Sequence, residues 1–227
     1  MRRDIHIFYL HGMGGGGDSR IPSILNEYFM AHTFRPLDGK EEEIHVEVIV
    51  RTYDFDPEKA SRQIQGWLQE CQPTLIIGES LGSIHAIRLK GYPHILVSPS
   101  LGAPAWMGNC APLARIPGME WLMDRIFKGK EGDRQKMYFQ YPYLVKYKEH
   151  GRLALANSPK EGSQDYFYAF FGTKDHYRKS GVVSVRRYRK YFGDTYTMYE
   201  GTHFMEEEYL HSLLVPKILE YLRIVEK

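Results

Sequence analysis

Short apolar runs alternate with longer segments of helical pattern along most of this 227-residue chain. The runs, rich in β-branched and aromatic residues, lie at 5–10, 44–53, 74–78, 94–100, 166–175 and 195–201. The segments with helical spacing lie at 20–31, 57–71, 81–90, 180–191 and 205–225. Strands that alternate with helices build parallel sheets, because each right-handed crossover between parallel strands is made by a helix. We therefore expect a single α/β domain over residues 1–227, with a mostly parallel sheet flanked by helices.

Glycine-rich or polar segments follow four of the expected strands. They read HGMGGGG (11–17), GESLG (78–82), GTKD (172–175) and EGTHF (200–204). Ligands of parallel sheets bind at the carboxyl ends of the strands, so these segments are candidates for a functional site. They contain a serine, an aspartate and a histidine, in the order Ser80, Asp175, His203.

Ser80 stands between two glycines at the point where a strand gives way to a helix. A serine hydroxyl is a poor nucleophile at neutral pH unless a base lies within hydrogen-bond reach and a third group orients that base. A tight strand-to-helix turn exposes the hydroxyl, and glycine at 78 and 82 avoids steric clashes within such a turn. The free N–H groups at the start of the following helix favour a developing oxyanion nearby.

With the four segments together, the chain resembles the α/β-hydrolase superfamily, in particular its small bacterial serine esterases. The resemblance extends over nearly the whole chain. It implies that Ser80 is the nucleophile, His203 the general base and Asp175 the acid that orients the base. It also implies that the backbone N–H groups of Met13 and Leu81 form the oxyanion hole.

The resemblance has two further implications. The supporting loops around the site are formed by His11, Gly12, Gly14, Gly78 and Gly82. Since the chain has no room for the additional leading strands of larger members, we expect a reduced sheet of about six strands. The reaction of such a site needs no metal and no organic cofactor, and no Cys/His cluster here has the spacing of metal ligands.

Other residues compete for these roles. Asp54 and Asp165 are rivals for the acid, although Asp165 precedes its strand rather than following it. The rivals for the base are His85, His176 and His211. His176 adjoins Asp175 on the same loop, which makes it a poor partner for that carboxylate.

The segment HGMGGGG also fits other functions. Gly12, Gly14 and Gly17 match the G-x-G-x-x-G pattern of dinucleotide-binding loops, but Asp54 lies about twice as far along as the expected ribose-binding acid. Gly12 and Gly17 also have the spacing of the two glycines in a phosphate-binding P-loop. Asp18, however, occupies the position of the P-loop lysine and would repel phosphate. The basic run RRYRK (186–190) is more typical of a solvated helix face than of a nucleic-acid site.

Residues 102–165 interrupt the strand and helix alternation. This insertion leaves the expected sheet at the edge where the site should lie, so we expect a cap or lid that shapes an acyl pocket. The alternative is that its aromatic residues only pack the insertion onto the body. These residues are Trp106, Trp121, Phe127, Tyr138, Phe139, Tyr141, Tyr143 and Tyr147.

Charge and cysteine content narrow the class of protein. A net charge of +2 gives no global field that would favour nucleic acid or a membrane surface. Two cysteines do not make a disulfide framework, and no stretch has the length of a membrane span. We expect a cytoplasmic protein; the sequence carries no signal for its oligomeric state.

The expected function is hydrolysis of a small-molecule carboxylic ester or thioester through an acyl-enzyme. Two alternatives remain open on the same fold. One is an acyltransferase that uses the same three side chains with a different acceptor, and the other is a non-catalytic ligand-binding protein.

Overall fold

The structure, a computed structural model, describes residues 2–127, 131–156 and 166–227. Within these ranges one sheet contains eight strands in the order β7-β6-β5-β4-β1-β3-β2-β8. The strands are β1 (Arg2–Leu10), β2 (Phe34–Pro36), β3 (Glu43–Val50), β4 (Leu75–Glu79), β5 (Pro93–Val97), β6 (Tyr166–Gly172), β7 (Tyr196–Tyr199) and β8 (Ile224–Glu226). The expectation of a mostly parallel sheet in an α/β fold is confirmed.

The six expected strands are β1, β3, β4, β5, β6 and β7, and the pairings among these six are all parallel. The sheet also contains two short strands beyond the six or so that were expected, β2 and β8. β2 pairs antiparallel with both β3 and β8. Each of the two has only three residues, too few to produce a strand pattern in the sequence.

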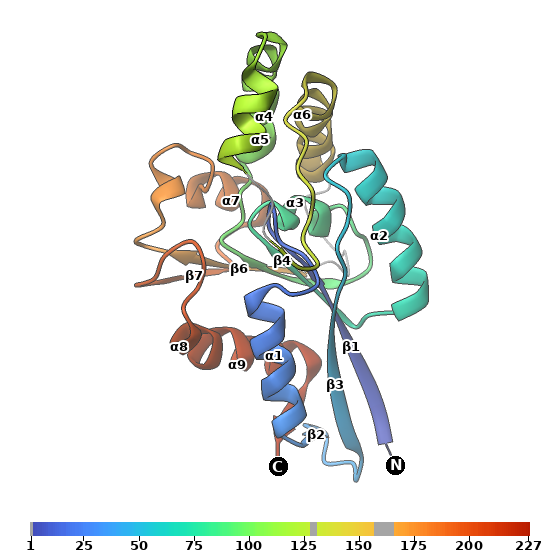
Figure 1. Ribbon diagram of the computed structural model, residues 1–227. Helices are drawn as coiled ribbons and strands as arrows, with labels where there is room; N and C mark the ends of the chain where they lie inside the picture. Colours follow the sequence, from blue (N-terminus) through green and yellow to red (C-terminus); the bar gives the residue numbers. More distant parts are fainter. Residues whose placement is uncertain (1, 128–130, 157–165) are drawn as a thin grey trace.

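Helices cover both faces of the sheet (Figure 1). The helical segments are α1 (Arg20–Ala31), α2 (Pro57–Cys71), α3 (Gly82–Ile87), α4 (Ala103–Cys110), η1 (Ala111–Arg115), α5 (Met119–Ile126), α6 (Tyr141–Ala156), η2 (His176–Arg178), α7 (Val185–Phe192), α8 (Glu207–Tyr209), η3 (Leu210–Leu214) and α9 (Val215–Leu222). The single helix expected over 205–225 is divided into α8, a π-helical η3 and α9. The helix ends at Leu222 because Arg223 has a left-handed φ of 54°.

The core has two layers because neighbouring strand residues point to opposite faces. Phe8 and Ile76 pack on the face covered by α2, α3, α6 and α7. Ile7 and Ile77 pack on the face covered by α1 and α9. Both faces of the central strands are therefore apolar, as expected of a parallel sheet between two helical layers.

The chain reverses its direction of sheet growth between β1 and β4. β3 is added on one side of β1, and β4 and the following strands are added on the other. At such a switch point the loops beyond two neighbouring strands diverge and leave a crevice. The loop after β1 and the turn after β4 therefore meet at the carboxyl edge of the sheet.

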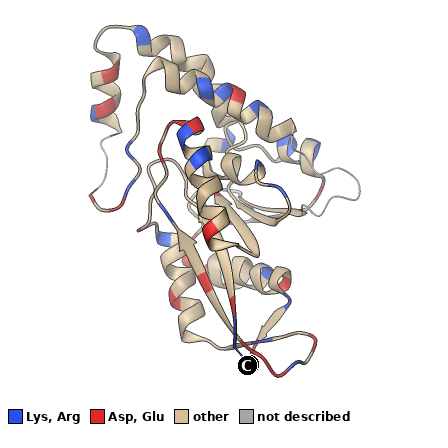
Figure 2. Cartoon of the chain, turned by 90° about the vertical axis from the view of Figure 1, so that its right-hand side faces the viewer, with Lys and Arg blue, Asp and Glu red and all other residues tan. Residues whose placement is uncertain are grey.

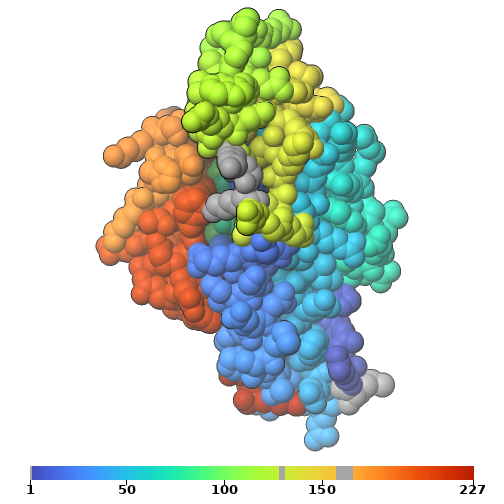
Figure 3. Space-filling model, in the orientation of Figure 1, coloured from blue at the N-terminus to red at the C-terminus, as the bar shows by residue number. Residues whose placement is uncertain are grey.

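The insertion expected over 102–165 separates β5 from β6 and contributes α4, η1, α5 and α6. Of this range, 128–130 and 157–165 lie outside the described residues. α4, α5 and α6 project beyond the carboxyl edge of the sheet (Figure 1). Figure 3 shows a hollow in the molecular surface where the insertion, the N-terminal third and the C-terminal third of the chain meet.

The aromatic residues of the insertion serve different purposes. Tyr147 is fully buried and its hydroxyl donates to the carbonyl oxygen of Phe55 at 2.8 Å. Phe139 is also buried, and its ring centroid lies 5.7 Å from that of Phe55. Trp106 and Trp121 are 53% and 64% exposed. Part of the aromatic set thus anchors the insertion to the body, as the alternative interpretation expected, and part faces solvent.

Candidate active site

Ser80 occupies a sharp turn between β4 and α3. Its φ of 50° lies in the left-handed region, which is strained for a residue with a side chain. Three backbone hydrogen bonds hold it there. Its N–H donates to the Val97 carbonyl at 2.9 Å, and its own carbonyl accepts from Ser100 N at 3.1 Å and Ser83 N at 3.2 Å. The turn is therefore fixed by the end of the neighbouring strand β5.

The two glycines that flank Ser80 are required by close packing. A Cβ on Gly82 would lie 2.2 Å from the carbonyl oxygen of Leu10. A Cβ on Gly78 would lie 2.8 Å from the Cα of Ser83. The start of α3 thus approaches β1 more closely than any side chain would permit, which brings the turn against the loop after β1.

His203 and Asp175 meet because they follow neighbouring strands. The loops after β6 and β7 are joined by hydrogen bonds from Thr173 N to the Tyr199 carbonyl, 2.8 Å, and from Lys174 N to the Gly201 carbonyl, 2.9 Å. The sequence places these segments 28 residues apart. Parallel pairing of β6 with β7 brings them to the same edge.

Ser80, His203 and Asp175 form a hydrogen-bonded chain. Ser80 Oγ lies 2.8 Å from His203 Nε2, and His203 Nδ1 lies 2.7 Å from Asp175 Oδ2. The other carboxylate oxygen, Oδ1, accepts from Tyr177 N at 2.8 Å. Asp175 and His203 are 3% and 2% exposed. In this arrangement Nδ1 donates to the carboxylate, so Nε2 is free to accept the serine proton.

Two contacts fix the loop that carries His203. The guanidinium of Arg20, at the start of α1, donates to the carbonyl oxygens of Phe204 and Met205. The ring of Tyr177 packs against the imidazole edge-on, with centroids 4.7 Å apart. Sequence reasoning assigned no role to Arg20, and its helical position gives no signal for one.

The two amide groups expected to form an oxyanion hole belong to the turn at Ser80 and to the loop after β1. Leu81 directly follows Ser80 and precedes α3. Met13 lies in the loop after β1, where Gly12 approaches so closely that a Cβ on it would be 3.1 Å from Ser80 Cβ. Among the hydrogen bonds of the described residues, neither the Met13 nor the Leu81 N–H has a partner. Both donors are thus available to a ligand.

The remaining amides of the glycine loop are engaged within the protein. Gly14 N donates to the Gln135 side chain at 3.2 Å and Gly15 N to the Gly12 carbonyl at 3.0 Å. Gly16 N and Gly17 N donate to the hydroxyls of Ser19 and Thr52 at 3.0 and 2.9 Å. A phosphate-binding loop needs such amides to face its ligand, so this geometry disfavours the dinucleotide and P-loop interpretations.

The insertion lies directly against this loop. Gln135 is 2% exposed, and its backbone N–H donates to the Gly15 carbonyl at 2.7 Å. A Cβ on Gly16 would overlap the Asp133 carbonyl oxygen, at 1.8 Å. Asp18, at the lysine position of the P-loop frame, forms an ion pair with Arg134 at 2.6 Å. The successive glycines therefore serve the packing of the insertion as well as the turn beside Ser80.

His11, expected in the supporting loop, is fully buried and stacks on Tyr53 with centroids 4.1 Å apart. Its Nδ1 lies 2.8 Å from the Gly12 carbonyl. Burial lowers the pKa of His11 to about 4. A neutral imidazole here supports the loop by hydrogen bonding and stacking.

Sequence reasoning missed Ser100 beside the nucleophile and assigned no role to Glu79, the residue before it. Ser100 is 2% exposed, and its Oγ lies 3.1 Å from Ser80 Oγ. Glu79 accepts a hydrogen bond from the Tyr9 hydroxyl at 2.8 Å, and this bond links β4 to β1 directly before the turn. Burial raises the pKa of the Glu79 carboxyl. The sequence segment SPS gives no signal that Ser100 faces Ser80, because the contact depends on how β5 ends.

The rival histidines lie elsewhere. His85 is buried and lies 3.0 Å from His150, Nδ1 to Nε2. His176 is exposed on η2, with its ring centroid 6.3 Å from that of His203. His211 is exposed on η3.

Of the rival acids, Asp54 accepts from Asp56 N at 2.8 Å, beside the start of α2. Asp165 lies outside the described residues. In residues 2–127, 131–156 and 166–227, no group of three or more His, Cys, Asp or Glu side chains has a metal-binding arrangement. No helix in these ranges combines the length and apolarity needed to cross a bilayer.

Comparison with known proteins finds solved structures that share the fold of this chain. No protein-family model and no curated protein sequence matches the chain. Solved structures do match. The monoacylglycerol lipase of Paleococcus ferrophilus is 17% identical with a TM-score of 0.55, and the match covers 96% of this chain and 93% of that one.

Two further matches have a similar extent. One belongs to the metagenome-derived lipolytic enzymes LipS and LipT, at 13% identity and a TM-score of 0.57, over 96% of this chain and 93% of that one. The other is the enol-lactonase of Burkholderia xenovorans LB400, at 13% identity and a TM-score of 0.56, over 97% and 92%. At these identities the likeness establishes a shared fold.

Proposed function

We propose, from the α/β-hydrolase fold that this chain has, that the protein is a serine hydrolase of carboxylic esters or thioesters. The observation that carries the proposal is the hydrogen-bonded chain from Ser80 through His203 to Asp175. A hydroxyl, an imidazole and a carboxylate linked in this order activate a serine as a nucleophile. The hydrolases among the structural matches support the same class of reaction.

In the first half of the proposed reaction, Ser80 Oγ attacks the carbonyl carbon while His203 Nε2 takes its proton. Asp175 accepts the Nδ1–H bond, which keeps Nε2 free and stabilises the imidazolium that forms. The negative charge on the former carbonyl oxygen is received by the Met13 and Leu81 amides. Both amides are fixed by the fold before substrate binds, so little reorganisation opposes charge development.

Collapse of the tetrahedral intermediate breaks the bond to the leaving alcohol or thiol, which receives the proton from His203. The acyl group is then held as an ester on Ser80. Water attacks this ester as His203 removes its proton, and the second intermediate expels Ser80 Oγ, which regains a proton. The products are a carboxylic acid and the alcohol or thiol, and the enzyme is restored.

We further propose that the insertion over 102–165 is a cap that contributes to the acyl site. Met137 supports this role because its Cε lies 3.3 Å from the position of a Cβ on Gly14, one residue from Met13. We expect Met137→Ala to shift the preference of the enzyme toward longer acyl chains. An unchanged preference would remove this residue from the acyl site.

A fluorophosphonate probe tests the proposed nucleophile, because it labels activated serines. We expect labelling of the wild-type protein, loss of labelling in Ser80→Ala and full labelling in Ser180→Ala. Ser180 is an exposed control on the loop after η2. A protein that only binds ligands would not be labelled, and that outcome would refute the proposal.

Turnover of nitrophenyl esters of increasing chain length, with acyl thioesters in parallel, identifies the substrate class. We expect Ser80→Ala to lower kcat by roughly 10⁴- to 10⁶-fold. Added alcohols, amines and thiols test the acyltransferase alternative: acylated acceptor that forms faster than free acid would favour it over hydrolysis.

A further inference from the structure

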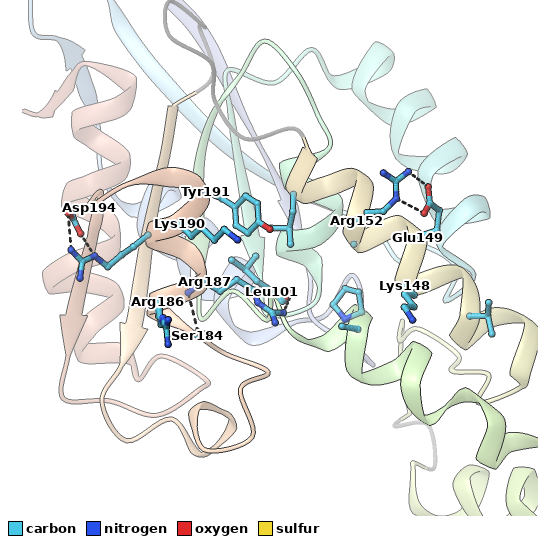
Figure 4. A pocket seen from close by; sticks show the side chains of 16 residues that line it. Leu101, Lys148, Glu149, Arg152, Ser184, Arg186, Arg187, Lys190, Tyr191 and Asp194 are labelled. Carbon is cyan, nitrogen blue, oxygen red and sulfur yellow. Dashed lines mark hydrogen bonds and ion pairs between the residues drawn. The ribbon is translucent and has the colours of Figure 1, made fainter.

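A groove of about 1150 Å³ lies between α6 and α7, bordered by the start of α4 (Figure 4). None of Ser80, His203 and Asp175 lines it. Its volume slightly exceeds the roughly 300–1,000 Å³ of typical small-molecule binding sites. The groove is thus a second candidate site, independent of the chemistry proposed for Ser80.

Cationic side chains dominate both walls of this groove. Its lining contains six of them and two anionic ones, Glu149 and Asp194, so its net charge is +4, whereas the whole chain carries +2. Elsewhere on the molecule both signs are interspersed along helices and strands (Figure 2). The six are Lys148 and Arg152 of α6 and Arg186, Arg187, Arg189 and Lys190 of α7.

The two anionic residues neutralise only part of this charge. Glu149 accepts both hydrogen bonds of a bidentate pair with Arg152, at 2.7 and 2.6 Å. Asp194 pairs with Arg189. Arg187 donates to the Leu101 carbonyl at 3.0 Å, which positions the guanidinium without cancelling its charge.

Four cations, Arg187 included, remain without an acidic partner among the described residues. The side chains of Lys148 and Arg186 form no ion pair or hydrogen bond with a described residue, and Lys190 Nζ lies 5.6 Å from the centroid of the Tyr191 ring. Figure 4 shows that these cations come from both sides of the groove. An anion within it would therefore have positive charge on two sides, which is far more favourable than a contact with one exposed lysine.

The groove is not purely polar. Leu101, Pro104, Val145 and Leu155 supply apolar lining, and the Tyr191 ring adds an aromatic surface. An aromatic ring of this kind stacks a planar base, and neighbouring cations bind phosphate oxygens. The ligand that fits has a flat or apolar body joined to more than one negative charge.

We propose that the groove between α6 and α7 binds a nucleoside polyphosphate. The base lies over the apolar lining beside Tyr191, and the phosphates lie between Lys148 on one wall and Arg186 and Lys190 on the other. The same chemistry is present in a free nucleotide and in coenzyme A, which carries a phosphorylated nucleoside. The basic run at 186–190 then forms one wall of a ligand site rather than a solvated face alone.

Fluorescence anisotropy with a fluorescent ADP derivative tests the proposal on the full chain. We expect saturable binding with a Kd below about 1 mM that weakens with added salt. Lys148→Glu and Lys190→Glu, on opposite walls, should each raise Kd by about tenfold or more. Displacement by ADP, by coenzyme A and by pyrophosphate distinguishes a free nucleotide from a nucleotide-bearing carrier and tests whether the base contributes.

Arg62→Glu is the matched control, because Arg62 is exposed on α2 outside the groove and the charge change is the same. It should leave Kd unchanged, and all three variants should keep the wild-type Tm because the residues are exposed. Absence of saturable binding, or an equal loss in Arg62→Glu, would overturn the proposal. So would binding of a single-stranded oligonucleotide that depends on the groove while no mononucleotide binds.

Discussion

His203 Nδ1 lies 2.7 Å from Asp175 Oδ2, and both side chains are almost completely buried. The carboxylate is itself held by the backbone N–H of Tyr177. The Asp175 carboxylate is therefore held in place, and its hydrogen bond fixes the orientation of the His203 imidazole. Because Nδ1 donates to this carboxylate, Nε2 is the nitrogen left to accept from Ser80.

Asp175→Asn tests the importance of this orientation. The amide N–H₂ group would donate to Nδ1 and favour the wrong tautomer, so we expect kcat for ester hydrolysis to fall by about 10⁴-fold, as in serine proteases. The Tyr177 N–H can still bond to the amide oxygen, so Tm should change little. Asp194→Asn, at an exposed position, is the control and should retain activity. Full activity in Asp175→Asn would exclude the proposed role of this carboxylate.

Ser100→Ala tests the second hydroxyl at the site. Since Ser80 donates to His203 before attack, the 3.1 Å contact requires Ser100 to donate to Ser80 Oγ. This bond stabilises negative charge on Oγ both when it attacks and when it leaves. We expect kcat to fall about fivefold, equivalent to about 1 kcal/mol.

Ser98→Ala is the matched control for Ser100→Ala. Ser98 also follows β5 and is buried, but its hydroxyl lies beside the Tyr199 side chain. We expect its removal to leave kcat unchanged. Equal effects of the two substitutions would indicate that Ser100 acts only through packing.

Two glycine substitutions separate tight packing from helix propensity. Gly82→Ala would place a Cβ 2.2 Å from the Leu10 carbonyl, so we expect it to lower the free energy of unfolding by about 3 kcal/mol or to prevent folding. Gly66→Ala, within α2, meets nothing within 4 Å and should raise stability by about 0.5 to 1 kcal/mol. Urea titration measures both. A neutral Gly82→Ala would show that the approach of α3 to β1 is looser than described.

Stability should fall in mild acid because of buried histidines. Burial lowers the pKa of His11 to about 4 and of His150 to about 3, with Arg88 adding to the effect on His150. Between these values and about 6.5 the unfolded chain binds protons that the folded chain does not, so unfolding becomes easier as pH falls. From pH 6.5 to 5 the loss is about 2 kcal/mol for each histidine.

Denaturant unfolding at pH 7 and at pH 5 measures this loss. His150→Gln should reduce the difference between the two pH values by about 2 kcal/mol, even if the variant is less stable at both. The control His211→Gln, at an exposed position, should leave the difference unchanged. A wild-type protein equally stable at both pH values would contradict the prediction.

The local pattern of the sequence determined the fold class and the order of the main elements. Apolar runs marked the six parallel strands because each has at least four residues, and central strands such as β1 and β4 are apolar on both faces. The glycines at 78 and 82 marked the turn at Ser80 because no other residue fits there. The two short strands β2 and β8 left no such signal, since three residues carry no period.

Only the tertiary structure decided which residues contact one another. The pairing of β6 with β7 brings His203 to Asp175, and the end of β5 brings Ser100 to Ser80. The packing of the insertion explains Gly16, whose space is taken by the Asp133 carbonyl. Such contacts join residues that are distant in the chain. The sequence gives the type of each residue, but strand pairing and loop conformation decide which residue it contacts.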